Sequence, residues 1–267
     1  MIRKPVVEGQ FYPKKINEIA TIIENFRLKQ SSRTNARGIV MPHAGYIYSG
    51  RVAATTVNQV QPKKKIIILG PNHSGHGKNF ALWAKGSWKI SDNNVKIDET
   101  IAQSILKEDG LIEEDYGAHE FEHSIEVQLP ILHYFFKEFE FVPITCKLST
   151  LNNYRQCANQ IFQAVKKIKE DILLIASTDM THYQADARAR SKDRLAIEKI
   201  IDLDDDGLLK IVAKENISMC GAAPTAILIA CLKQMGARKA QVTLYQTSGD
   251  TGGDKESVVG YAGIIIQ

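Results

Sequence analysis

Four side chains that can bind metals or transfer protons stand where an apolar run of the sequence breaks. They are His43, His73, His182 and Cys220. The three histidines follow runs that are typical of buried strands, and the cysteine comes just before a run that is typical of a helix. In parallel α/β sheets, ligands bind outside the carboxyl ends of the strands. We therefore expect these side chains to line one cleft.

His43, His73 and Cys220 have the donor atoms of a transition-metal site. Two imidazoles and one thiolate suit zinc, copper or iron. Cys220 is expected at a helix start, where free amide groups lower the pKa of a thiol and favour the thiolate. Alternatively, each histidine only hydrogen-bonds within its turn, and Cys220 is a small buried hydrophobic residue. Three further cysteines fit that second description, because each lies within an apolar pattern: Cys146, Cys157 and Cys231.

Asp179 and His182 lie three residues apart, on a short turn after a predicted buried strand. A carboxylate can fix the tautomer of an imidazole and raise its basicity, as general acid–base chemistry requires. Alternatively, Asp179 caps a helix and His182 is a surface residue. Glu122, His123 and Glu126 are polar groups at another helix start, and His123 could reach the cleft. The residues alone leave these alternatives open.

The elements that would position these residues alternate between strand and helix along most of the chain. Apolar runs predict strands at 38–41, 66–69, 140–145, 171–176, 241–245 and 258–266. Helical periodicity predicts helices at 17–28, 51–60, 98–110, 152–168, 192–201, 207–214 and 222–235. This order is typical of a three-layer α/β/α fold with a mainly parallel central sheet. No repeat or linker interrupts it, so we expect a single domain over residues 1–267.

Some local details can be predicted as well. Asp98 is expected to cap the helix that follows it. Ser49 and Gly50 are expected to lead into the helix at 51–60. The segments 80–84 and 87–90, separated by Lys85 and Gly86, are expected to form a β-hairpin.

The composition excludes several classes of protein. The net charge of +4 comes from 34 basic and 30 acidic residues that are well mixed, and the lysine runs lack interleaved aromatic residues. Nucleic-acid binding is therefore not expected. No apolar stretch is long enough to span a membrane, and the N-terminus does not resemble a secretory signal. Four cysteines without paired spacing fit a reducing, cytoplasmic location.

Taken together and in order, the motifs resemble the Memo family, of the type that microbial AmmeMemoRadiSam systems contain as protein B. The resemblance covers nearly the whole chain, and it rests on Pro42–Tyr46 with Ser49-Gly50, Leu69–His73, Glu122–Glu126, Ser177–Asp179 with His182, and Cys220-Gly221 with Pro224. That family is similar in fold to class III extradiol dioxygenases, which open catechol rings with non-haem Fe(II). A similar fold is therefore implied for this chain.

The resemblance also implies roles for single residues. It places His43, His73 and Cys220 at the metal-ligand positions, where the dioxygenases use two histidines and a glutamate. It makes His182 the acid–base histidine, with Asp179 and His123 nearby. The implied cofactor is one transition-metal ion, with iron or copper favoured and zinc as a further option.

Two functions follow from the resemblance. The first is an iron- or copper-dependent redox enzyme of unknown substrate. The second is a non-catalytic partner protein that binds a peptide or a small anion in the same cleft. The implied partners are a small molecule or peptide in the cleft, with a functional link to a radical-SAM protein and an AMMECR1-type protein.

Overall fold

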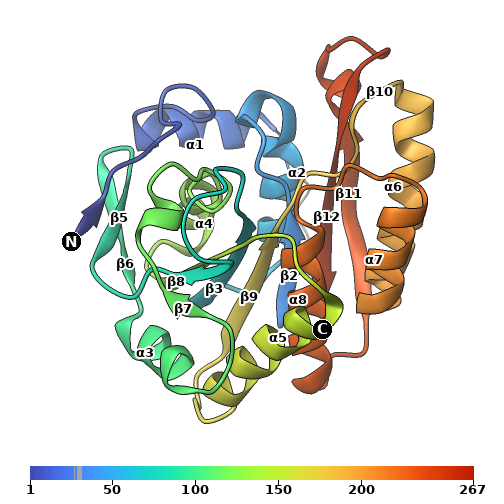
Figure 1. The fold of residues 1–267 in the computed structure, drawn as a ribbon. Coiled ribbons are helices and arrows are strands. Elements are labelled where there is room, and N and C mark those ends of the chain that lie inside the picture. Colours follow the sequence, from blue (N-terminus) through green and yellow to red (C-terminus); the bar gives the residue numbers. More distant parts are fainter. Residues whose placement is uncertain (27, 29–31) are drawn as a thin grey trace.

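The computed structural model describes residues 1–26, 28 and 32–267, and its centre is a parallel sheet (Figure 1). Four adjacent strands, in the order β8-β3-β9-β2, all run in the same direction. Their bounds are Gly38–Met41 for β2, Lys65–Pro71 for β3, Glu140–Cys146 for β8 and Ile172–Ser177 for β9. Nearly every residue in them is buried, which explains their continuous apolar sequences.

Shorter and antiparallel strands extend this core on both sides. Next to β2 lie β12 (Val258–Ile266), β11 (Ala240–Thr247) and β10 (His182–Gln184). Next to β8 lie β6 (Asn93–Ile97), β5 (Ser87–Ile90), β1 (Ile2–Arg3), β4 (Phe80–Leu82) and β7 (Glu113–Glu114). The sheet is therefore mixed, with the predicted parallel part at its centre.

Helices cover both faces of the sheet and complete the three layers. One group packs together on β2 and β12: α1 (Ile16–Asn25), α2 (Tyr46–Asn58) and α4 (Gln128–Phe136). The other group is centred on α8: α3 (Glu99–Lys107), α5 (Leu151–Val165), α6 (Asp186–Ile201), α7 (Asp205–Lys214) and α8 (Ala222–Gln234). The three-layer α/β/α prediction is therefore confirmed.

Most predicted elements form, with shifted ends. The helix predicted at 51–60 begins earlier, at Tyr46, so that Ser49 and Gly50 lie within it. A β-carbon at Gly50 would lie 3.0 Å from the Phe26 ring and 3.1 Å from the Tyr46 β-carbon, so a larger residue would crowd these side chains. Asp98 caps α3 as predicted, and its side chain accepts a hydrogen bond from the backbone N–H of Ile101. The helix predicted at 17–28 corresponds to α1, and residue 27 of that range lies outside the described residues.

The predicted hairpin between 80–84 and 87–90 is wrong. The strand β4 pairs with β8 and β7, whereas β5 forms its hairpin with the following strand, β6. Ser91 at the turn between β5 and β6 has a φ of 50°, and the preceding alternation of buried and exposed residues continues into β6. The Lys85-Gly86 break therefore separates two strands with different partners.

The parallel centre brings together the segments that carry the candidate residues. His43 lies two residues after β2, His73 two residues after β3 and Asp179 two residues after β9. Since these three strands are neighbours and parallel, the three segments meet at one edge of the sheet. In the described part of the chain, no helix has the length and apolar character that crossing a membrane requires.

Candidate metal centre

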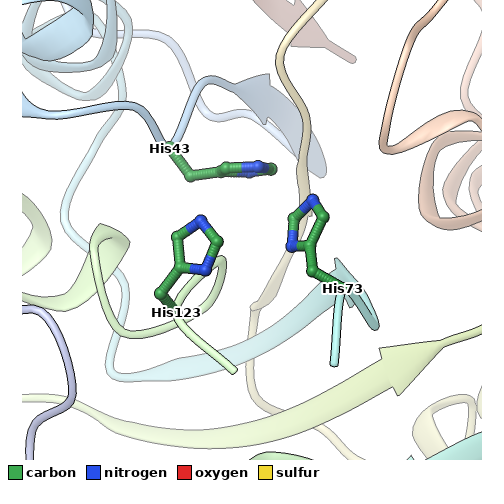
Figure 2. Close-up of side chains that lie close together, drawn as sticks. All are labelled: His43, His73 and His123. Atoms are coloured by element: carbon green, nitrogen blue, oxygen red, sulfur yellow. The ribbon is translucent and has the colours of Figure 1, made fainter. Parts of the chain in front are cut away.

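Three histidines converge at the carboxyl edge of the sheet. His43, His73 and His123 each offer one ring nitrogen, and these nitrogens lie within 4.8 Å of one another. The ring centroids are 4.9 to 5.6 Å apart. Figure 2 shows the three rings directed toward a common point from three separate segments of the chain. Three imidazoles at this spacing could bind one metal ion.

Ser177 orients the ring of His43. The Ser177 hydroxyl lies 2.8 Å from Nδ1 of His43, donates to the Ser124 carbonyl and accepts from the Gln128 side-chain amide. A hydroxyl has only one proton to donate, so Nδ1 of His43 must be the donor in their contact. The other nitrogen, Nε2, then keeps its lone pair for a ligand.

Glu122 plays the corresponding part for His73. Its carboxylate lies 3.0 Å from Nδ1 of His73 and also accepts the backbone N–H groups of His73, His123 and Ser124. An ionised carboxylate only accepts, so Nδ1 of His73 carries a proton, and in the neutral ring Nε2 keeps its lone pair. A carboxylate that holds the non-coordinating nitrogen of a histidine is the usual support of a metal ligand.

Burial favours the neutral form of two of the three rings. Burial, with smaller contributions from the neighbouring histidines, lowers the pKa of His43 well below its usual value. Burial also lowers the pKa of His123. For His73, burial acts downward, but the hydrogen bond and charge of Glu122 outweigh it and raise the pKa. Burial tends to raise the pKa of Glu122, yet His73 and the backbone donors bring it down to about 2.

Cys220 lies beside His43 rather than at the centre of the three histidines. Its Sγ is 3.4 Å from Nε2 of His43 and accepts the backbone N–H of Asp179 at 3.2 Å. Burial and the nearby Asp179 carboxylate raise the pKa of the thiol. The expectation that a helix start lowers this pKa is therefore wrong, because burial outweighs it.

Asp179 and His182 are close to the centre but are not paired with each other. Asp179 accepts the backbone N–H of His43 at 2.9 Å, and burial raises its pKa to about 6. His182 begins β10 instead of lying on a turn. Ser218 holds it twice: its hydroxyl accepts the His182 backbone N–H at 2.7 Å, and its carbonyl lies 2.8 Å from Nδ1. The tautomer of His182 is thus fixed by a carbonyl and not, as expected, by Asp179.

A cleft of about 550 Å³ opens above these residues. The three histidines, Asp179 and His182 all line it, together with an apolar and aromatic wall: Phe11, Ile47, Tyr48, Tyr183, Val259 and Tyr261. Within the described chain, no lysine or arginine lines this cleft. Of the predicted site residues, only Cys220 is not part of the lining.

Sequence reasoning missed several residues that support the site. Ser177, Gln128 and Ser218 orient His43 and His182, but polar residues at strand ends and loops are common and carry no distinctive pattern. Glu122 was noticed as a polar residue at a helix start and as part of the Glu122–Glu126 motif, but no contact with His73 was assigned to it. Its spacing of 49 residues from His73 gave no sign that the two side chains meet.

Comparisons with known proteins agree over the whole chain. The family model described as "Memo-like protein" matches residues 3–265. A MEMO1 family protein of Methanopyrus kandleri is 40% identical and covers 100% of this chain and 99% of its own length. One from Saccharolobus islandicus is 41% identical over 98% of both chains. A solved but uncharacterized protein of Escherichia coli K12 has a TM-score of 0.59 at 11% identity, covers 86% of this chain and 99% of its own, and is similar in fold alone.

Proposed function

Since the chain belongs to the Memo family, we propose that it is a metal-dependent redox enzyme whose centre is held by His43, His73 and His123. The observation that carries the proposal is the convergence of three ring nitrogens within 4.8 Å at the base of a cleft. Two of these rings have the tautomer that leaves Nε2 free. The site is therefore prepared for a metal before any metal binds.

The donor set fits a redox-active transition metal. Imidazole nitrogens suit iron, copper and zinc, and three protein ligands leave positions for a substrate. The open cleft argues against a closed structural zinc site, which gathers four protein ligands, and we favour iron or copper over catalytic zinc because the family resemblance implies redox chemistry. Bound iron or copper would supply one-electron chemistry.

The chain itself would move protons through His182. Its Nδ1 donates to the Ser218 carbonyl, so Nε2 has the lone pair that a general base needs. His182 lines the same cleft as the three histidines. Asp179 would act indirectly, because its carboxylate holds the backbone of His43 in place.

Cys220 remains a competing ligand. The family resemblance assigns His43, His73 and Cys220 to the metal, whereas the geometry favours His123 in place of the thiol. The thiol lies 3.4 Å from the same His43 nitrogen that faces the centre. A metal bound there would draw the proton from the thiol, so the raised pKa does not prevent coordination.

Metal analysis after anaerobic reconstitution with Fe(II), Cu(I) or Zn(II) tests the proposal. We expect the wild type to bind one equivalent, and His43→Ala and His123→Ala to lose it. Cys220→Ala should retain the metal, and so should the matched control His76→Ala, whose ring is exposed. Loss in Cys220→Ala with retention in His123→Ala would instead identify the thiol as the third ligand.

The choice between redox and structural roles needs a second measurement. Iron- or copper-loaded protein should consume dioxygen when a reductant such as ascorbate is supplied, and zinc-loaded protein should not. A wild type that binds no metal under any reducing condition would refute the proposal as a whole.

One observation supports the alternative function of partner binding. Large apolar side chains are exposed at the cleft mouth, with Ile47 at 71% and Tyr183 at 78%. Such a rim suits a peptide with apolar side chains better than a small anion, since the cleft has no lysine or arginine within the described chain. Metal-independent binding of an apolar peptide, weakened in Ile47→Ser, would favour this function.

A further inference from the structure

Tyr261 stands in the wall of the cleft, in the middle of β12. Side chains alternate across a strand, so Val259 and Tyr261 face the same side, and both line the cleft. The intervening Gly260 faces away, since a β-carbon there would collide with the Asp193 carboxylate of α6. The backbone of Gly260 is also hydrogen-bonded to Met180 and Thr181. Tyr261 is thus fixed firmly beside the loop that carries Asp179.

The hydroxyl of Tyr261 has no hydrogen-bond partner among residues 1–26, 28 and 32–267, although the residue is only 2% exposed. Other tyrosines use theirs: buried Tyr12 donates to Glu126, buried Tyr46 to the Val127 carbonyl and half-buried Tyr245 to Asp193. Buried polar groups are normally paired. The Tyr261 oxygen is not one of the sealed, unpartnered atoms of the core, so it opens into the cleft.

The surroundings define what the hydroxyl could meet there. Burial, and after it the negative charge of Asp179, raise the pKa of Tyr261, so the group remains a protonated donor. The charged side chains in the described lining are Asp179 and Asp254, and no lysine or arginine joins them. A ligand with a phosphate or carboxylate would meet acidic groups and find no cationic side chain to pair with.

We infer that the Tyr261 hydroxyl donates a hydrogen bond to an oxygen of the ligand in the cleft, and that this ligand carries no negatively charged group away from the metal. This inference rests on the proposed function, because it places the ligand between the metal centre and β12. Tyr261 would thus favour ligands that carry an oxygen acceptor, while the apolar wall of the cleft contacts the apolar part of the ligand.

Isothermal titration of zinc-loaded protein with benzohydroxamic acid tests the inference. This probe is aromatic and binds metals through oxygen, and zinc keeps redox chemistry from interfering. Tyr261→Phe removes one hydroxyl and should bind the probe about tenfold more weakly. The matched control is Tyr134→Phe in α4, which also removes one tyrosine hydroxyl but lies outside the cleft lining, and it should bind like the wild type. The probe 4-carboxybenzohydroxamic acid adds one negative charge and should bind the wild type more weakly.

The outcomes separate this inference from the proposed function. Equal binding by Tyr261→Phe and the wild type would overturn the role of Tyr261 and leave the metal centre intact. If the wild type binds the carboxylated probe as tightly as benzohydroxamic acid, or more tightly, the inference that the ligand carries no negative charge away from the metal is overturned. A wild type that takes up no zinc, iron or copper would refute the proposed function and this inference with it. If Tyr261→Phe does not fold, Tyr261→Met fills the same wall without a donor and is compared in the same way.

Discussion

Two buried carboxylates, Glu122 and Glu126, lie four residues apart. Changing each in turn separates the side chain that supports metal binding from the side chain that stabilises the fold. Glu122 is 1% exposed and contacts His73, whereas Glu126 is fully buried and pairs with Arg3 at 2.7 Å. Each can be changed to glutamine, which keeps the shape and removes the charge. We expect Glu122→Gln to weaken metal binding and Glu126→Gln to weaken mainly the fold.

The contacts of Glu122 set the expected size of the first effect. Its Oε1 contacts Nδ1 of His73 and accepts the N–H groups of His123 and Ser124, while Oε2 accepts the N–H of His73. In Glu122→Gln, the amide oxygen can keep the contacts of Oε1. The amide NH₂ would then take the place of Oε2 and face the backbone N–H of His73, which loses its acceptor. One unpaired buried donor costs about 1–3 kcal/mol of stability. Losing the charge behind a metal-bound histidine typically lowers metal affinity about 10- to 100-fold.

Glu126 provides the matched control. It holds the Arg3 guanidinium, the backbone N–H groups of Val6 and Val7, and the Tyr12 hydroxyl, but no histidine. Breaking a buried ion pair by removing one partner costs about 3–5 kcal/mol. The free energy of unfolding in urea should therefore fall more in Glu126→Gln than in Glu122→Gln.

Metal affinity is measured by competition with a chromogenic zinc chelator, at a temperature where both variants are folded. The expected result is a large loss of affinity in Glu122→Gln and near wild-type affinity in Glu126→Gln. Equal losses in both variants would show that Glu122 acts through general stability and not through His73. Unchanged affinity in Glu122→Gln would refute the role of His73 as a ligand supported by this carboxylate.

Three further changes test the structure around the site. Ser177→Ala leaves the buried Gln128 amide without one acceptor and should lower the free energy of unfolding by about 1–3 kcal/mol. Unchanged stability in urea unfolding would contradict the importance of the Gln128–Ser177 hydrogen bond. Gly260→Ala would place a β-carbon 1.9 Å from the Asp193 carboxylate, and this overpacking should destabilise the fold by about 1–3 kcal/mol and lower the melting temperature. An unchanged melting temperature would contradict the close contact between Gly260 and Asp193. His119 has a pKa lowered by burial to about 3, against 6.5 in the unfolded chain, so its contribution to stability is complete above pH 6.5 and is lost as the pH falls toward 3. Urea unfolding at pH 7.5 and 5.5 should show a loss of up to about 1.4 kcal/mol per pH unit below 6.5, and this loss should be smaller in His119→Gln.

The parts of the fold that could be predicted are those whose signal is local. Continuous apolar runs identified β2, β3 and β9, because strands buried on both faces need apolar side chains at every position. The position of His43 and His73 just after such strands followed directly. The short strand β10 was missed, since its three residues are half exposed or exposed and pair only with β12.

The chemistry within the site was harder to predict because it depends on contacts between distant segments. His123 was expected in the cleft near the acid–base histidine His182, yet its ring nitrogen lies with those of His43 and His73. Its place follows from the path of residues 120–127 between η1 (Gly117–His119) and α4, where no periodic pattern exists. The pKa of Cys220 was misjudged for a similar reason, because burial depends on packing that the helix start does not reveal.

The segment from Glu122 to Gln128 connects all three histidines. It contains His123, it supports His73 through Glu122, and it reaches His43 through Ser177, whose hydroxyl lies between the Ser124 carbonyl and the Gln128 amide. Arg3 in β1 holds this segment by donating to the carbonyls of His119 and Glu122 and to Glu126. A shift of this one segment would move ligands and their supports together. Two of the three Arg3 contacts go to backbone carbonyls and do not need the Glu126 charge, so they can keep the segment in place in Glu126→Gln while Glu122→Gln disturbs His73 directly.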